Sequence, residues 1–216
     1  MNFLKQFNIK FNDKKLLETA LTHSSYANEC KNAVCYERLE YLGDAVLELV
    51  TSEYFYLNTN AKEGEMTKER ANYVCEKALA TYSKDIGIDK EIKLGQGQKN
   101  NLNDTIIADV FEAVCGAIYL DQGYSTAKKY IDKIVIPYIN KGIDFNSDYK
   151  TKLQELVQTD RKSVEYEITK EYGESHNKTF EVVVKVDGII YGKGKGKSKK
   201  EAEQMAALDA FNKSAR

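Results

Sequence analysis

The sequence predicts two domains, an all-helical domain followed by a small α+β domain. From residue 16 to about residue 138, apolar side chains recur mostly at spacings of three and four, as they do in packed helices. The single proline, Pro137, stands where a long helix is expected to end. A polar stretch without sustained periodicity follows, and beyond it short β-rich segments lie between two helical ones. The expected boundaries are 1–139 for the first domain, 140–147 for a linker and 148–216 for the second domain.

The second domain is expected to contain a helix, three strands and a final helix, in that order. The predicted elements are a helix over 149–158, strands over 164–172, 179–186 and 188–191, and an Ala-rich helix over 198–211. Ser198 is followed three residues later by Glu201, which is the pattern of a capping box. This pair predicts where the last helix begins.

Composition excludes several classes of protein. The 216 residues include 42% hydrophobic and 30% charged side chains, as in folded globular proteins. No run approaches the ~18 consecutive apolar residues of a membrane-spanning helix, and the first residues lack the apolar core of a signal peptide, so we expect no membrane association and no export. Four cysteines without a Cys-x-x-Cys pair, together with only two histidines, argue against a zinc site and fit a reducing cytoplasm.

Charge is divided unevenly along the chain. Residues 149–216 contain 14 Lys and Arg against 11 Asp and Glu, whereas residues 1–148 contain 18 against 22. The basic C-terminal part is therefore the part expected to approach a polyanion.

Acidic residues gather on one side of a helix predicted over 36–50. At about 100° per residue, Glu37, Glu40 and Asp44 fall within a sector of about 60°. The opposite, apolar side is expected to comprise Leu39, Leu42, Val46, Leu49 and Val50. By itself, this pattern also fits the solvated face of an amphipathic helix.

A second acidic pair lies on an otherwise apolar helix, over 106–120. Asp109 and Glu112 are its only charged residues and are neighbours on one face. Two ionised carboxylates on a buried helix are costly without compensation, so either a divalent metal or a partner from elsewhere in the chain is expected. Ligation by carboxylates alone favours a hard cation, Mg²⁺ or Mn²⁺, over zinc, and such cations suit phosphate chemistry.

The Gly- and Lys-rich stretch 192–198 precedes the last predicted helix, where a phosphate-binding P-loop would lie. Only three residues separate Gly192 from Gly196 where a P-loop has four, and Tyr191 stands where Gly is required, so no nucleotide cofactor is expected. The lysines are instead expected to surround a helix N-terminus, where free N–H groups attract the phosphates of a nucleic acid. The alternative is a lysine run that serves solubility.

These motifs carry a family resemblance. The segment 37–47, Glu-Arg-Leu-Glu-Tyr-Leu-Gly-Asp-Ala-Val-Leu, closely resembles the signature of the ribonuclease III family. Segments 20–26, 63–67, 108–114 and 116–123 resemble further motifs of that family in the same order. Segments 148–155, 176–180 and 197–204 are similar to parts of a double-stranded RNA-binding domain.

The resemblance implies an all-α endonuclease domain followed by an RNA-binding domain. It implies a cytoplasmic endoribonuclease that uses Mg²⁺, or Mn²⁺ in its place, to activate water and cleave double-stranded RNA, leaving 5′-phosphate and 3′-hydroxyl ends. Ribosomal, messenger and transfer RNA precursors are the implied substrates. The implied metal ligands are Glu40, Asp44, Asp109 and Glu112, of which Asp44 and Glu112 look most directly tied to catalysis. Glu37 and Glu63 match acidic positions of the family's cleft, with plain solvated surface as the alternative.

The resemblance also implies partners. Two strands need two carboxylate clusters, which the family supplies as a homodimer whose signature helices pack together. Tyr41 is placed at that contact, unless it packs in the core. In the RNA-binding domain, Gln154, Glu155 and His176 resemble minor-groove contacts. Lys199 and Lys200, with Lys197 behind them, resemble a phosphate clamp.

Rival functions are a non-catalytic double-stranded RNA-binding protein and a metal-dependent DNA nuclease. The first would be expected to lose at least one of the four carboxylates, all of which are present. The second conflicts with a domain that reads 2′-hydroxyls. A nucleophile formed by His23 with Ser24 and Ser25 lacks an acid to orient the imidazole, so a helix cap is the simpler interpretation.

Overall fold

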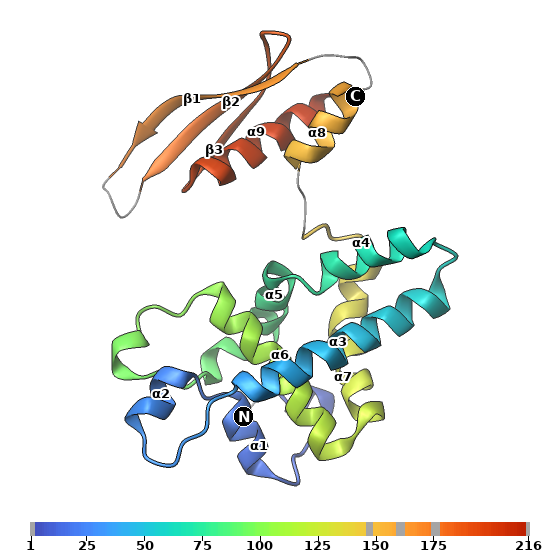
Figure 1. The fold of residues 1–216 in the computed structure, drawn as a ribbon, viewed down its shortest axis with the longest axis vertical. Helices are drawn as coiled ribbons and strands as arrows, with labels where there is room; N and C mark the ends of the chain where they lie inside the picture. Colours follow the sequence, from blue (N-terminus) through green and yellow to red (C-terminus); the bar gives the residue numbers. More distant parts are fainter. Residues whose placement is uncertain (1–2, 146–148, 159–162, 174–177, 215–216) are drawn as a thin grey trace. The chain divides into compact units, whose positions relative to one another are not determined.

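The computed structural model of the chain describes residues 3–145, 149–158, 163–173 and 178–214. The chain divides into two compact units, Met1–Asn146 and Ser147–Arg216 (Figure 1). None of the helices in the described residues is both long and apolar enough to cross a membrane.

The first unit is helical, as the sequence predicts. Its α-helices are α1 (Lys14–Ala20), α2 (Ser24–Glu29), α3 (Glu37–Asn58), α4 (Glu63–Tyr73), α5 (Glu76–Ile86), α6 (Asp104–Gln122) and α7 (Tyr124–Asn140). Short 3-10 turns occur at Lys5–Phe7, Asp89–Glu91 and Gln96–Gln98. Pro137 lies in the last turn of α7, so this helix continues for three residues beyond the proline before it ends.

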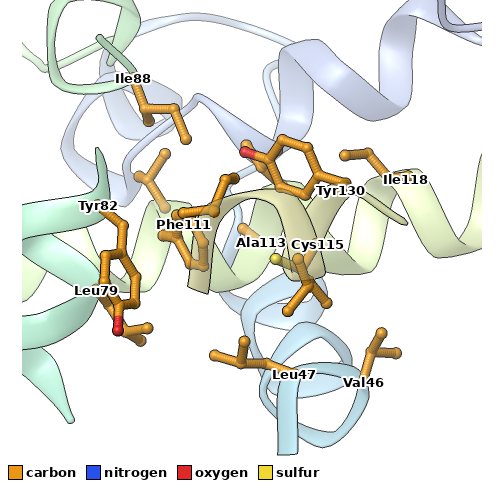
Figure 2. Close-up of a cluster of buried hydrophobic side chains, with 14 of the residues drawn as sticks. Val46, Leu47, Leu79, Tyr82, Ile88, Phe111, Ala113, Cys115, Ile118 and Tyr130 are labelled. Carbon is orange, nitrogen blue, oxygen red and sulfur yellow. The ribbon is translucent and has the colours of Figure 1, made fainter. Parts of the chain in front are cut away.

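Helix α6 forms the centre of this unit because it is apolar on nearly every side. Phe111 and Cys115 of α6 are fully buried among side chains from the surrounding helices, including Leu47 of α3, Tyr82 of α5 and Tyr130 of α7 (Figure 2). The side chain of Asn103 accepts a hydrogen bond from the N–H of Ile106 at 3.0 Å and so caps the start of α6.

The chain between α7 and the second unit is partly packed onto the first unit. Phe145 falls within the stretch expected to be a linker, yet it is buried and its ring lies near those of Tyr73, Tyr82 and Tyr138. Its backbone N–H donates to Asn72 Oδ1 at 2.7 Å. The hydrophobic effect explains why Phe145 packs here, because burying its ring against other aromatic rings removes apolar surface from water.

The second unit has the predicted order of elements, α8 (Tyr149–Gln158), β1 (Val164–Tyr172), β2 (Thr179–Val186), β3 (Ile189–Gly196) and α9 (Lys199–Ser214). The strands form an antiparallel sheet in the order β1-β2-β3, with Val164 opposite Val186 and Phe180 opposite Gly196. Both helices lie on one face of this sheet, and α9 contacts β2, β3 and α8 (Figure 1). Asp187 and Gly188 both have positive φ, as expected for the tight turn of a β2–β3 hairpin.

The third strand is longer than the sequence predicts, which corrects the expectation for the Gly- and Lys-rich stretch. Residues 192–196 are part of β3 and form no loop before the helix. A Cβ at Gly194 would lie 2.2 Å from both the carbonyl oxygen of Ala202 and the nitrogen of Ala206, so only glycine allows the Ala-rich α9 to pack on this strand. Lys193 and Lys195 alternate with these glycines and are therefore directed away from α9.

The predicted cap of α9 is present in a shifted form. The N–H of Glu201 donates to Ser198 Oγ at 3.1 Å. The carboxylate of Glu201 accepts from the N–H of Lys197 at 2.7 Å, one residue earlier than a capping box requires. Of the lysines expected around this helix start, Lys197, Lys199 and Lys200 are located there.

Candidate metal centre and nucleic-acid surface

Two glycines let α3 and α6 cross with their backbones in contact. A Cβ at Gly43 would lie 1.7 Å from the carbonyl oxygen of Glu112, and one at Gly116 would lie 2.4 Å from the carbonyl oxygen of Leu39. Gly43 immediately precedes Asp44, and Gly116 lies one turn after Glu112. The crossing therefore brings the predicted carboxylates of the two helices to one place.

The functional importance of these two glycines was not predicted from the sequence. The available signal was a glycine in the interior of each of two helices, where it costs about 1 kcal/mol relative to alanine. Such a cost indicates that a close backbone approach requires the residue.

The carboxylates act on one another electrostatically. The pKa of Glu112 is raised to about 8, chiefly by burial and then by the nearby charges of Asp44 and Glu40. Burial likewise raises the pKa of Glu40, with contributions from Asp109, Glu37 and Asp44. Burial also raises the pKa of Asp109, while a hydrogen bond from Tyr36 acts in the opposite direction. The four carboxylates thus form one electrostatic cluster.

Within the cluster, protein groups compensate the negative charge only in part. The Tyr36 hydroxyl donates to Asp109 Oδ2 at 3.1 Å. Among the described residues, no Lys or Arg forms an ion pair with any of the four carboxylates. Asp109 therefore has partners from elsewhere in the chain, the Tyr36 hydroxyl and, more weakly, His23. In the part of the chain that the structure describes, no ion pair with Lys or Arg balances the charge of the cluster.

The donor set fits a hard divalent cation. Carboxylate oxygens from two helices are the ligands that Mg²⁺ and Mn²⁺ prefer. As the side chains stand, no group of three His, Cys, Asp or Glu in the described ranges is close enough together to hold a metal ion. Carboxylates without a cation between them repel one another. Because the two backbones are in contact at Gly43 and Gly116, the side chains would need only to rotate to converge on a cation.

The two predicted cleft acids lie at different places. Glu37 is exposed at the start of α3 and contributes to the raised pKa of Glu40. Glu63 begins α4 and lines a separate cavity of about 210 Å³ with Ser52 and Tyr56, from the second half of α3. Within one chain, Glu63 therefore does not join the carboxylate cluster.

Helix α3 also has an exposed apolar side, which corrects part of the predicted pattern. Tyr41 is 83% exposed, so it does not pack in the core. Leu49 was expected on the buried side but is 56% exposed. Side chains at spacings of three and four form a row along this side, which we call the α3 stripe. The stripe consists of Tyr41, Ala45, Leu49, Ser52 and Tyr56. None of these five side chains is charged.

His23 caps a helix, as the simpler interpretation predicted. It is the residue before α2, and its Nδ1 accepts a hydrogen bond from the N–H of Ser25 at 3.1 Å. The same nitrogen lies 2.8 Å from Ser25 Oγ. These contacts explain the His-Ser-Ser sequence by local structure.

The predicted RNA-binding side chains lie on the solvent sides of α8 and α9. Gln154 and Glu155 are exposed, while Leu153 and Val157 of the same helix are buried. Lys197, Lys199 and Lys200 are exposed at the start of α9. His176 lies outside the described residues.

A salt bridge and a hydrogen bond link the two helices that carry these side chains. Lys150 Nζ of α8 lies 2.6 Å from Glu203 Oε2 of α9. The backbone N–H of Lys150 donates to Gln204 Oε1 at 3.3 Å. The second unit thus presents polar and basic side chains on two helices held together.

Comparisons with known proteins agree with this division of the chain. Residues 13–139 match the family model described as ribonuclease-III-like, and residues 149–214 match the double-stranded RNA binding motif. The chain is 46% identical to Ribonuclease 3 of Streptococcus gordonii over 217 residues, which covers 96% of this chain and 93% of that protein. It is 47% identical to Ribonuclease 3 of Phytoplasma mali over 212 residues, covering 97% and 94% of the two chains.

A solved structure is similar to the first unit. The nuclease domain of ribonuclease III from Campylobacter jejuni, described as flexible in a region involved in dimer formation, is 36% identical with a TM-score of 0.56. The match covers 62% of this chain and 96% of that domain. The two family models match in the order expected, and the relatives are similar over nearly their full length. The chain belongs to the ribonuclease III family of double-strand-specific endoribonucleases.

Proposed function

We propose that the chain cleaves double-stranded RNA with Mg²⁺, or Mn²⁺ in its place, bound by Glu40, Asp44, Asp109 and Glu112. The observation that carries this proposal is the cluster itself, in which α3 and α6 bring carboxylates together without a Lys or Arg partner among the described residues. Burial and then the neighbouring carboxylates raise the pKa of Glu112, and a divalent cation would offset both effects by favouring the ionised carboxylate. The products would carry 5′-phosphate and 3′-hydroxyl ends.

The bound cation would polarise a phosphoryl oxygen and lower the pKa of a water molecule. The protein contributes the placement of its carboxylates. Asp44 has the strongest charge effect on Glu112, which supports these two as the pair nearest the reacting phosphate. Glu40 and Asp109 lie near one another, because the Asp109 charge is the largest contribution from a neighbouring charge to the raised pKa of Glu40. Each of the four lies on a helix of nineteen residues or more, so the backbone supporting it is rigid.

The second unit would bind the duplex. Gln154 and Glu155 on α8 face solvent, as side chains that enter a minor groove must. Lys197, Lys199 and Lys200 at the start of α9 would contact phosphates, because lysines and free helix N–H groups attract anions together. Precursors of ribosomal, messenger and transfer RNA in the cytoplasm are the proposed substrates.

A second copy of the chain would cover the α3 stripe. An uncharged face that includes Tyr41, Leu49 and Tyr56 is typical of an interface helix. In a two-fold contact, each residue meets the same partner in both directions, so two antiparallel α3 helices would place Tyr41 opposite Tyr56. That arrangement would also bring Glu63 of one copy towards Glu37 of the other. The exposed stripe and the similarity to a domain with a dimer-forming region support this proposal.

Cleavage of a labelled RNA duplex tests the catalytic proposal. The native protein is expected to cut with Mg²⁺ and to stop in EDTA, while Glu112→Gln binds the duplex without cutting. Glu69→Gln, which removes an exposed carboxylate on α4, is the matched control and should cut normally. Binding without cleavage by the native protein under every divalent metal would leave only a binding protein. Equal cleavage of duplex DNA would contradict the substrate assignment.

Sedimentation velocity tests the dimer. Leu49→Glu places a charge in the α3 stripe and is expected to yield monomers. The control is Leu57→Glu, which changes another exposed leucine about 100° around the helix from Tyr56 and should leave the dimer intact. A native protein that sediments as a monomer at micromolar concentration would overturn the proposed interface.

A further inference from the structure

Tyr36 connects the start of α3 to the carboxylate cluster. It is the last residue before α3, and only 3% of its surface is exposed. Its hydroxyl reaches across to α6 and donates to Asp109 Oδ2 at 3.1 Å. Its position just before the acidic helix does not by itself indicate this contact.

The position of this side chain is determined by contacts on several sides. The backbone N–H of Tyr36 donates to the carbonyl oxygen of Thr22 at 3.0 Å, and its own carbonyl oxygen accepts from the N–H of Glu40 at 3.0 Å. Its ring centroid lies 5.8 Å from that of His23, which caps α2. The hydroxyl is therefore held by the junction of α1 and α2 as well as by α3.

The hydrogen bond selects one orientation of the Asp109 carboxylate. A carboxylate that is free to rotate presents either oxygen, at an entropic cost when a cation binds. Tyr36 occupies Oδ2 of Asp109, and no other hydrogen bond to this carboxylate occurs among the described residues. Oδ1 is therefore the oxygen that remains available to a cation. A phenol is suited to this task because it donates a hydrogen bond without adding a positive charge, which would compete with the cation.

We propose that Tyr36 is a positioning residue for the metal centre: its hydroxyl holds the Asp109 carboxylate in the orientation that binds a divalent cation. This inference rests on the proposed function, because it takes Asp109 to be a metal ligand. It goes further by assigning a structural role in metal binding to the α1–α2 junction, which contributes no ligand of its own.

The test compares two substitutions that each remove one buried hydroxyl. Tyr36→Phe deletes the donor to Asp109. Tyr82→Phe is the matched control, because Tyr82 is fully buried and its hydroxyl donates to the carbonyl oxygen of Tyr73 at 3.2 Å. Melting temperatures of the two variants report whether each has folded and how much stability each has lost.

Metal binding is measured without reference to catalysis. Mn²⁺ is titrated into metal-free protein, and the free ion is followed by electron paramagnetic resonance. Tyr36→Phe is expected to bind Mn²⁺ about 10-fold more weakly, the effect typical of losing a group that orients a ligand. Tyr82→Phe is expected to bind it as the native protein does. The Mg²⁺ concentration for half-maximal cleavage should rise in parallel for Tyr36→Phe, while its affinity for duplex RNA in EDTA stays unchanged.

A double substitution assigns the effect to Asp109. In the background of Asp109→Asn, adding Tyr36→Phe is expected to change Mn²⁺ affinity no further, because the group that it orients is already lost. A further loss of about 10-fold in that background would overturn the inference.

The outcomes separate the two proposals. If the native protein neither binds Mn²⁺ nor cuts duplex RNA, the metal centre fails and the role of Tyr36 fails with it. If the native protein binds Mn²⁺ and cuts RNA but Tyr36→Phe matches Tyr82→Phe in every measurement, the metal centre stands and the role of Tyr36 is overturned.

Discussion

In both units of this chain, glycines allow two backbones to make close contact, but the charged side chains around the two contacts differ. The first contact brings acidic side chains together, and the second leaves basic side chains in solvent. At the crossing of α3 and α6, Gly43 and Gly116 bring helices together so that carboxylates approach one another. At the contact of β3 with α9, the glycines of the strand let the helix pack closely on it, while Lys193 and Lys195 of the strand and Lys199 and Lys200 of the helix stay exposed to solvent.

The carboxylate cluster costs the first unit stability, whereas the lysine surface costs the second unit little. Partial burial beside other carboxylates raises the pKa of Glu112, so its ionised form destabilises the fold. Lysines that remain hydrated cost little, so the second unit gains a phosphate-binding surface without such a loss.

The largest effect is expected from Gly43→Ala. Its Cβ would meet the carbonyl oxygen of Glu112, which is backbone and cannot rotate away, so the first unit should lose more than about 3 kcal/mol of stability. Because the second unit has its own core, duplex RNA binding should persist. Circular dichroism melts combined with RNA-binding measurements check both expectations.

The matched control is Gly64→Ala in α4, where nothing lies within 4 Å of the added Cβ. This change is expected to stabilise the first unit by about 0.5–1 kcal/mol, because alanine favours a helix more than glycine does. If both substitutions destabilise the protein equally, the backbone contact at Gly43 is not the cause.

The reciprocal prediction concerns Gly194→Ala. Its Cβ would lie against the backbone of Ala202 and Ala206, so the second unit should lose about 2–3 kcal/mol while the first unit keeps its melting temperature. Duplex RNA binding should weaken. Loss of the first unit's melting transition would show that the two units are not independent.

A smaller effect is expected from the pH dependence of stability. The pKa of Glu112 is raised from its ordinary value of 4.5 to about 8, so folding favours its protonated form. This contribution is fully present below about pH 4.5 and is lost as the pH rises through about 8. Allowing for partial exposure, metal-free native protein should lose on the order of 2 kcal/mol relative to Glu112→Gln between pH 5 and pH 8.

Urea unfolding of both proteins in EDTA measures this difference. A stability gap that does not change with pH would show that Glu112 is ionised throughout the range.

The smallest effects concern single lysines. Lys199→Ala and Lys200→Ala should each reduce the slope of log K against log salt concentration by about one and weaken binding to all duplex sequences alike. Lys213→Ala is the control, because Lys213 pairs with Asp209 at 2.5 Å in the last turn of α9, away from the helix start. Fluorescence anisotropy across a salt series measures the slopes. An unchanged slope for both lysines of the helix start would remove them from the phosphate contact.

Much of this architecture could be predicted from the sequence. The periodicity indicated the helical first unit, and the ranges of α8, β1 and β2 agree with those expected. Their ranges could be predicted because the hydrophobic periodicity that specifies each of these short elements lies within the element itself. The extent of β3 could not be predicted, because a Gly- and Lys-rich segment has little intrinsic strand preference and is extended here by packing against α9.

The candidate site divides in the same way. Residue type and local spacing are enough to predict that Asp109 and Glu112 lie on an apolar helix and that lysines surround the start of the last helix. The packing of the helices is needed to show that Gly43 and Gly116 bring the two acidic helices together and that Tyr36 contacts Asp109. It is also needed to show that Leu49 and Tyr41 face solvent and that Glu63 lies apart. The physical reason is that local spacing specifies the face of a helix, whereas contacts between residues far apart in the chain depend on how the helices pack.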